Sequence, residues 1–272
     1  MEEKTQPLVS IIIACYNGEK YIDSCMQALL NQTYSNIEII VCDDASLDNS
    51  LEKLLGWQKK DKRIRVVHNA INMYAGASRN RCIEESNGEY CAIQDIDDIS
   101  APNRVEVLLN DLLEKNEIAF VSSQMSAFIE DYNNPFTTLT AGKEFPTRKN
   151  FLSGQPFNHP ATMFRTCCLK DVGGYRISKE TRKAEDYDLY MRLYAKGYKG
   201  HNLACSLYYF RLDSENIKRR DFEGRIGEHK VRLYGYKLLK MMPWAYIFTL
   251  KPYVAHFYQK VKFRFLMKKK AK

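Results

Sequence analysis

The chain has 272 residues, and its 41 Lys and Arg against 33 Asp and Glu give a formal net charge of +8. The charge is uneven: residues 1–215 hold 25 basic and 30 acidic residues, whereas residues 216–272 hold 16 basic and 3 acidic residues. A composition of 45% hydrophobic and 27% charged residues is that of an ordinary globular protein, which excludes a chain that is disordered throughout. No apolar run approaches the roughly 18 residues that a membrane-spanning helix needs, so we expect no spanning helix.

The N-terminus and the cysteines indicate a cytoplasmic protein. Acidic residues stand where a secretory signal has basic ones, and no small-residue cleavage site follows the first apolar run. None of the eight cysteines forms a C-x-x-C pair, so we predict buried thiols in a reducing compartment and neither disulfides nor a zinc cluster. The five within predicted strands and helices are Cys15, Cys25, Cys42, Cys82 and Cys91.

The first hundred residues alternate β-branched apolar runs with helical periodicity, which predicts βαβ units around a parallel sheet. We expect strands over residues 9–16, 37–43, 64–69 and 89–95, and helices over residues 21–31, 47–58 and 75–86. A helix over residues 105–115 and a strand over residues 118–128 follow. The pattern indicates a doubly wound α/β fold.

The second half of the chain is less regular. Pro135, Pro146 and Pro156 interrupt residues 133–158, which predicts a loop with little regular structure that serves as a flap. Another helix is expected over residues 184–195, and a largely helical tail from residue 219, broken near Pro243 and Pro252. We therefore divide the chain into a domain over residues 1–215 and a basic tail over residues 216–272.

Two groups of carboxylates follow predicted strands at the edge where α/β folds bind ligands. Asp43 and Asp44 end the second strand, and either contact a ribose hydroxyl or a base N–H, or cap the next helix. Asp95, Asp97 and Asp98 end the fourth strand, where three carboxylates repel one another unless a cation neutralises them. Asp-x-Asp oxygens suit Mg²⁺ or Mn²⁺; the alternative is a solvated acidic loop.

A third acidic group, Glu185, Asp186 and Asp188, opens the predicted helix over residues 184–195. Acidic residues favour the start of a helix because of its dipole, which explains one of the three well and the others less well. A carboxylate at a helix start beside a cleft is also placed to act as a general base.

Six segments stand in an order and spacing that resemble family 2 glycosyltransferases of the GT-A fold, the type that builds bacterial cell-surface glycans. The resemblance covers roughly residues 8–211. It implies a Rossmann-like mixed sheet flanked by helices, with a nucleotide-sugar-binding half over residues 8–104 and an acceptor-binding half over residues 105–215. The segments are VSIIIACYNGEKYI, VCDDAS, ASRNRCIEESNGEY, QDIDDISAPNR, VGGY and AEDYDLYMRL.

The resemblance also implies an activity, namely inverting transfer of a sugar from a nucleotide-diphosphate donor, with UDP expected. The acceptor would be a hydroxyl of a glycan or lipid-linked molecule, and the cofactor Mn²⁺ or Mg²⁺. A metal would neutralise the leaving diphosphate, while a base activates the weakly acidic hydroxyl. Two other functions stay open: a non-catalytic nucleotide-sugar-binding module, and a nucleotidyltransferase, whose glycine-rich phosphate loop is missing here.

Residue roles follow from the same resemblance. Tyr16 and Asn17 would edge the nucleobase, Asp44 would read the uracil N–H, and Asp43 would be its ribose-side neighbour. Arg79, in the Arg-Asn pair, would lie close to the nucleotide. The usual glycine-containing turn before this pair is replaced by Met73 and Tyr74, which predicts altered base selectivity.

The remaining roles concern the chemistry. Asp97 is assigned to the metal, and Asp95 to the metal, a metal-bound water or the ribose, with Asp98 in support; Asp186 is the base. Weaker candidates for acceptor or diphosphate contact are Glu185 and His159, although a lone histidine before proline is more often structural. Arg211 matches an arginine near the phosphates, but Asp213 replaces the histidine that follows it in the family.

The tail interleaves aromatic residues with Lys and Arg. This pattern favours an anionic membrane surface, which would place the protein peripherally on the inner face of the plasma membrane. Packing of the tail on the domain is the main alternative. Basic and aromatic residues also suit nucleic acid, but we expect no nucleic-acid partner.

Overall fold

The computed structural model describes residues 6–212 and 222–257. The predicted boundary at residue 215 and the basic segment over residues 258–272 lie outside these ranges. None of the helices in the described ranges has the length and apolar character needed to cross a bilayer.

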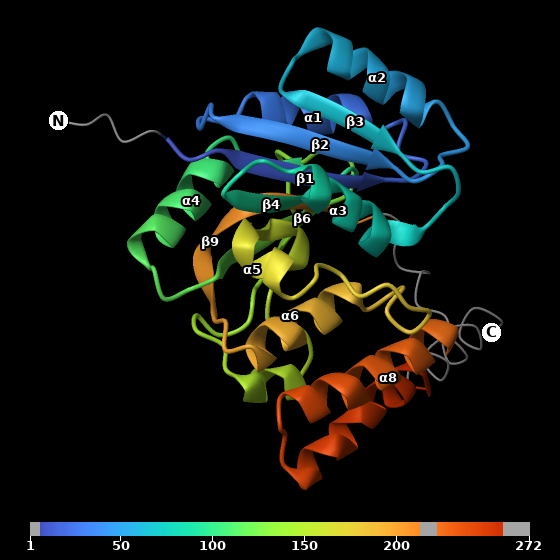
Figure 1. Ribbon diagram of the computed structural model, residues 1–272, viewed down its shortest axis with the longest axis vertical. Helices are drawn as coiled ribbons and strands as arrows, with labels where there is room; N and C mark the ends of the chain where they lie inside the picture. Colours follow the sequence, from blue (N-terminus) through green and yellow to red (C-terminus); the bar gives the residue numbers. More distant parts are fainter. Residues whose placement is uncertain (1–5, 213–221, 258–272) are drawn as a thin grey trace, which may run out of the picture.

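A nine-stranded mixed sheet forms the centre of the molecule (Figure 1). Its main strand order is β3-β2-β1-β4-β8-β6-β9-β5, and β7 pairs with β6. The first four strands are parallel to one another, as predicted, and β8 joins β4 in the antiparallel direction. The strands are β1 (Val9–Cys15), β2 (Ile37–Asp43), β3 (Ile64–His68), β4 (Tyr90–Asp95), β5 (Ile99–Ser100), β6 (Phe120–Phe128), β7 (Thr137–Leu139), β8 (Thr162–Arg165) and β9 (Gly200–Arg211).

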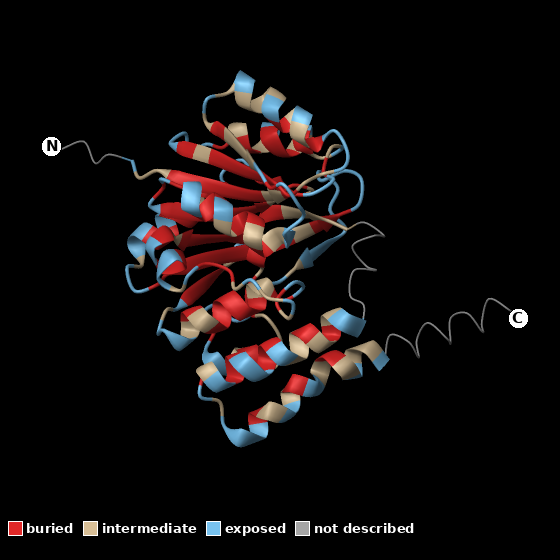
Figure 2. Ribbon diagram, turned by 45° about the vertical axis from the view of Figure 1, so that its right-hand side comes forward, coloured by how far each residue is buried: buried red, intermediate tan, exposed pale blue. Residues whose placement is uncertain are grey.

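The continuous apolar runs of the first strands are explained by burial on both faces of the sheet. In β1, Ile11 and Ile13 belong to one hydrophobic cluster, whereas Ile12 belongs to the other. One cluster is covered by α1 (Ile22–Leu30), α2 (Ser50–Lys60) and α4 (Arg104–Glu114). The other is covered by α3 (Tyr74–Glu85), α5 (Thr166–Asp171), α6 (Glu185–Ala195) and α8 (Phe222–Leu238). Figure 2 shows the strands as a buried centre between these layers.

The expectation of little regular structure over residues 133–158 is wrong in part. This region contains β7 and a 3₁₀ helix, η1 (Arg148–Leu152), whose start is a capping box between Thr147 and Asn150. Phe151 within η1 is fully buried and stacks on Tyr187 of α6. The proline-rich segment is therefore anchored to the core by an aromatic contact.

The cysteines are free thiols, as predicted, but the expectation that they are buried is wrong for Cys167 and Cys205, which are exposed. The other six are buried, and burial raises the pKa of Cys15 to about 12, so it stays protonated. Cys167 and Cys168 have sulfur atoms 3.9 Å apart and are not bonded.

The tail is helical where it is described. α8 is followed by a long 3₁₀ helix, η3 (Pro243–Leu250), which confirms the break near Pro243. The break expected near Pro252 is wrong, because residues 251–257 continue as α-helix with the proline in the first turn, where it needs no N–H partner. α8 packs on the domain: Val231 and Tyr236 are fully buried in the same cluster as α6.

Candidate active site

A cavity of about 750 Å³ opens at the carboxyl ends of β1 and β4. Its walls come from the loop after β1, the start of α3, the turn after β4 and the start of α6. The structure thus brings together eight of the predicted residues from five separate segments. They are Tyr16, Asn17, Arg79, Asp95, Asp97, His159, Glu185 and Asp186.

The turn after β4 divides its three acids between cavity and interior. Asp95 and Asp97 line the cavity. Asp98 is buried, and its Oδ1 accepts the backbone N–H of Arg211 at 2.7 Å. Burial and the charges of Asp97 and Asp95 raise the pKa of Asp98 well above its usual value. A raised pKa favours the neutral form of a carboxyl, so the buried Asp98 contributes little of the negative charge at this turn.

Arg79 links the two acidic groups that face the cavity. Its Nη2 donates to Asp95 Oδ1 at 2.7 Å, and its Nη1 lies 3.3 Å from Glu185 Oε1. Burial alone would lower the pKa of Arg79, but Asp95, Tyr175 and Glu185 raise it. The guanidinium therefore stays charged between the end of β4 and the start of α6.

The acids at the start of α6 have different surroundings. Asp188 is fully buried between Arg176 and Arg192, at 2.7 and 2.6 Å, and so has a structural role. Glu185 and Asp186 line the cavity. Burial and the charge of Asp186 raise the pKa of Glu185 to about 7, although Arg79 opposes the shift.

Asn80, beside Arg79, explains the Val-Gly-Gly-Tyr segment. Its side-chain amide exchanges two hydrogen bonds of 2.7 Å with the backbone of Tyr175. Gly174 has a φ of +62°, and a Cβ there would overlap Asn80 Oδ1. A left-handed conformation in close contact with a side chain requires glycine.

Asp43 and Asp44 are buried and are not among the residues that line the cavity. Asp44 Oδ1 accepts from Asn69 Nδ2 at 2.7 Å and from the Met73 N–H at 2.9 Å. Neither caps α2, since the Ser50 N–H at its start is bound by Asp48. The observed contacts brace the loops beside the cavity, and the nucleobase and ribose roles stay predictions.

Met73 and Tyr74, which stand in place of a glycine-containing turn, include a residue in the left-handed conformation that glycine usually adopts. Tyr74 has a φ of +68°, which is costly for a bulky residue. Its ring lies 4.2 Å from the Arg182 guanidinium, and its hydroxyl accepts from Arg182 at 3.1 Å. This contact holds the strained turn, and altered base selectivity stays a prediction.

His159 and Arg211 are engaged with the protein itself. The ring nitrogens of His159 lie 3.2 Å from the Tyr190 hydroxyl and 2.9 Å from the Tyr175 hydroxyl. Burial and the charge of Arg79 hold the pKa of His159 well below its usual value, which supports the structural interpretation. Arg211 donates its Nε to the Asp97 carbonyl at 2.9 Å and thereby supports the acidic turn. A phosphate contact stays a prediction, and Asp213 lies outside the described residues.

The model of glycosyl transferase family 2 matches residues 10–170, more than half of the chain. The chain belongs to this family. The family 2 assignment is supported by a relative, the putative glycosyltransferase EpsE of Bacillus subtilis (strain 168), which is 34% identical over 253 residues, 92% of this chain and 90% of the relative. The UDP-Glc:alpha-D-GlcNAc-diphosphoundecaprenol beta-1,3-glucosyltransferase WfaP of Escherichia coli is 30% identical over 230 residues, 82% of this chain and 85% of WfaP.

Solved structures show the same fold. S. aureus TarS 1-349 in complex with UDP-GlcNAc superposes with a TM-score of 0.68 at 19% identity, covering 85% of this chain and 70% of that one. The mannosyltransferase PcManGT from Pyrobaculum calidifontis, in complex with GDP-Man and Mn²⁺, gives a TM-score of 0.64 at 16% identity, covering 93% and 75%. This family 2 glycosyltransferase therefore has the GT-A fold that its sequence predicted.

The acidic turn of this glycosyltransferase fits a metal ion that draws most of its ligands from elsewhere. Within residues 6–212 and 222–257, no three His, Cys, Asp or Glu side chains form a cluster that could hold an ion. Only Asp95 and Asp97 of the turn line the cavity. Two carboxylates suit a Mg²⁺-like ion, which keeps several positions for phosphate oxygens and water.

The sequence interpretation missed two residues, Tyr208 and Arg104, that hydrogen-bond to the backbone at and near the acidic turn. Tyr208 in β9 accepts the Asp95 N–H at 3.0 Å. Arg104, fully buried, donates to the carbonyls of Ile93 at 2.6 Å and Pro160 at 3.0 Å. Arg104 lies in the Asp-Asp-Ile-Ser-Ala-Pro-Asn-Arg run and is the first residue of α4, two positions after Pro102. This position near a proline is the one sequence signal for it.

Proposed function

We propose that this family 2 glycosyltransferase inverts the anomeric centre as it transfers a sugar from a UDP-sugar to a hydroxyl of a glycan or lipid-linked acceptor in polysaccharide synthesis. One observation carries the proposal: a single cavity is lined by two separate acidic pairs, Asp95 with Asp97 and Glu185 with Asp186. Two relatives support the donor, because WfaP is named for UDP-Glc and TarS is solved with UDP-GlcNAc.

The two pairs suit the two demands of the reaction. A divalent cation held by Asp97, with Asp95 beside it, would neutralise charge on the leaving diphosphate. Asp186 accepts the proton of the acceptor hydroxyl as that oxygen attacks the anomeric carbon from the side opposite the diphosphate. The family resemblance assigns the base to Asp186, which lines the cavity beside Glu185. Tyr16, half-exposed at the rim, offers a ring for the uracil.

Turnover of labelled UDP-sugars with Mn²⁺ tests this proposal. We expect Asp186→Asn to lower turnover by about 10²–10⁴, the usual contribution of a general base, and to keep UDP binding. Asp97→Ala is expected to weaken Mn²⁺-dependent UDP binding as well. Asp171→Asn, an acid on the surface away from the cavity, is the matched control.

The products separate the competing functions. Release of UDP from the UDP-sugar supports the transferase, and release of pyrophosphate from a nucleoside triphosphate would instead indicate a nucleotidyltransferase. Binding of UDP-sugar without any turnover would indicate a non-catalytic module. Parental turnover in both Asp97→Ala and Asp186→Asn would remove these residues from the mechanism.

We also propose that the tail brings the enzyme to an anionic membrane surface as a peripheral protein. Three large apolar side chains of the described tail, Met242, Trp244 and Phe257, are more than half exposed. Lipid headgroups would cover them, and a lipid-linked acceptor would then be within reach.

A further inference from the structure

A second pocket, of about 830 Å³, lies between the tail and the domain. The tail contributes α8, the end of η3 and residues 251–255, and the domain contributes the loop after η1 and the start of α6. Asp186 lines both this pocket and the cavity that holds the acidic turn. The proposed base therefore stands where the two spaces meet.

Cationic residues outnumber acidic ones among the described residues that line the pocket. Four cationic residues line it, together with Asp186 and Glu228. The Glu228 carboxylate lies 3.0 Å from Arg232 and 3.5 Å from Arg225. Both arginines are only 4% exposed, so their charge acts in a region of low dielectric. An anionic group such as a diphosphate complements this set. The four cations are Lys183, Arg225, Arg232 and Lys251.

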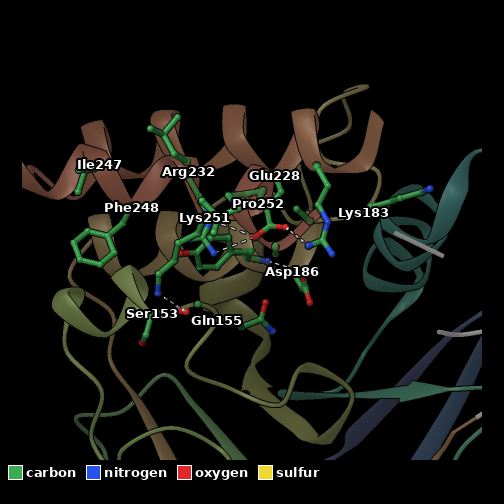
Figure 3. A pocket seen from close by; sticks show the side chains of 17 residues that line it. Ser153, Gln155, Lys183, Asp186, Glu228, Arg232, Ile247, Phe248, Lys251 and Pro252 are labelled. Carbon is green, nitrogen blue, oxygen red and sulfur yellow. Dashed lines mark hydrogen bonds and ion pairs between the residues drawn. The ribbon is translucent and has the colours of Figure 1, made fainter. Parts of the chain in front are cut away.

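The opposite part of the pocket is apolar and opens to the surface. Ile247, Leu250 and Val254 line it and are 68%, 47% and 67% exposed. Their spacing of three and four residues places them along one side of the η3 segment and its continuation. Figure 3 shows Asp186 and Lys183 toward one end of the pocket, and Ile247 and Phe248 toward the other.

We propose that this pocket is the acceptor site and that it selects an acceptor sugar carried on a lipid diphosphate. The sugar hydroxyl would lie at Asp186, the diphosphate among the four cations, and the first part of the lipid chain along Ile247, Leu250 and Val254. The inference rests on the proposed function and gives the tail a second role: α8 and η3 complete the acceptor site, in addition to contacting the membrane.

Binding of farnesyl diphosphate, a sugar-free probe, tests the pocket directly. The full chain carrying Trp57→Phe keeps Trp244 as its one tryptophan, and that ring lies 6.2 Å from the pocket residue Phe248. Titration is done with saturating UDP and Mn²⁺, below the concentration at which the probe forms micelles. We expect the fluorescence of Trp244 to change saturably as farnesyl diphosphate is added. Inorganic diphosphate and farnesol should each bind at least about tenfold more weakly than this probe.

Variants then locate the probe. Lys251→Glu and Val254→Asp should each weaken binding by about tenfold, whereas Lys237→Glu and Leu233→Asp, exposed changes on α8 outside the pocket, should stay within about twofold. The inference is overturned if the probe does not bind while UDP is saturating, if inorganic diphosphate binds as tightly, or if both pairs of variants behave alike. UDP binding is measured in the same samples: its absence in the parent would count against the proposed donor, whatever the probe does.

Discussion

At the scale of single residues, the pair of Arg79 and Glu185 decides how the cavity is charged. The Arg79 guanidinium contacts two carboxylates, that of Asp95 at the end of β4 and that of Glu185 at the start of α6. Because the second contact is longer, at 3.3 Å against 2.7 Å, Arg79 stabilises Asp95 more strongly than Glu185. Burial and the charge of Asp186 outweigh Arg79 and raise the pKa of Glu185 to about 7, so about half of this carboxyl is protonated at pH 7.

The raised pKa of Glu185 predicts a pH-dependent stability. The folded protein holds this proton more tightly than the unfolded chain, where the glutamate pKa is about 4.3. The resulting stabilisation is complete below about pH 4 and is lost as the pH rises through the folded pKa of about 7. Between pH 5 and 8 we expect the free energy of unfolding of Glu185→Gln to rise relative to the parent by about 2–3 kcal/mol.

Urea unfolding at pH 5, 6, 7 and 8 measures this difference. Glu52→Gln, on an exposed position of α2, corrects for the general pH dependence of the fold. Parallel curves for the parent and Glu185→Gln would show that burial does not shift this carboxyl.

At the scale of elements, α3 is fastened to the segment before α6 by Asn80. Its two hydrogen bonds to the Tyr175 backbone fix the residue whose hydroxyl reaches His159 at 2.9 Å. We expect Asn80→Ala to lower the free energy of unfolding by about 1–3 kcal/mol, because buried backbone groups lose their partners. Turnover should fall too, since the start of α6 carries Asp186.

Denaturant unfolding and turnover are measured together for this variant. Asn133→Ala, which removes an exposed contact within a loop, serves as the control. A stability loss equal to that of Asn133→Ala would mean that the Val-Gly-Gly-Tyr segment is held by packing alone.

The elements with strong periodicity were predictable from the sequence, and those made by distant pairing were not. β1, β2, β3, β4 and β6 have apolar runs that need no knowledge of their neighbours. β8 has only four residues, and β9 has a solvent-exposed middle, so neither displays a clear pattern. Pairing with β6 defines both.

The same division applies to the site. Asp95 and Asp97 were predictable as candidates because they follow a strand at the ligand-binding edge of the sheet, and Asp186 because it opens a helix with periodic apolar residues. The contact between Arg79 and Glu185 joins residues 106 positions apart, and local sequence gives no indication of it. Likewise the acceptor pocket depends on how the tail folds back, which the charge of residues 216–272 does not reveal.

At the scale of the whole molecule, the tail combines two surfaces. Its inner side packs on α6 and builds the pocket, while Met242, Trp244 and Phe257 are exposed and do not line it. Exposed residues of the tail helices are visible in Figure 2. Residues 258–272 add seven basic residues and no acidic one. Apolar rings beside cations are suited to the boundary of an anionic bilayer.

Membrane contact can therefore be tested without disturbing the pocket. We expect the full chain to sediment with vesicles containing phosphatidylserine, and to do so less in high salt because the headgroup attraction is screened. The combined variant Met242→Ser, Trp244→Ser and Phe257→Ser should bind such vesicles at least about tenfold more weakly, since each buried side chain contributes about 1.5–3 kcal/mol.

The control for this experiment carries the same number of apolar-to-serine changes at exposed positions of the domain, Leu113→Ser, Ile129→Ser and Phe136→Ser. It should sediment like the parent. Farnesyl diphosphate should bind both combined variants as tightly as it binds the parent. Because the first variant lacks Trp244, this binding is measured by calorimetry and not by fluorescence. If the parent stays in the supernatant at low salt, the exposed residues of the tail do not meet a membrane.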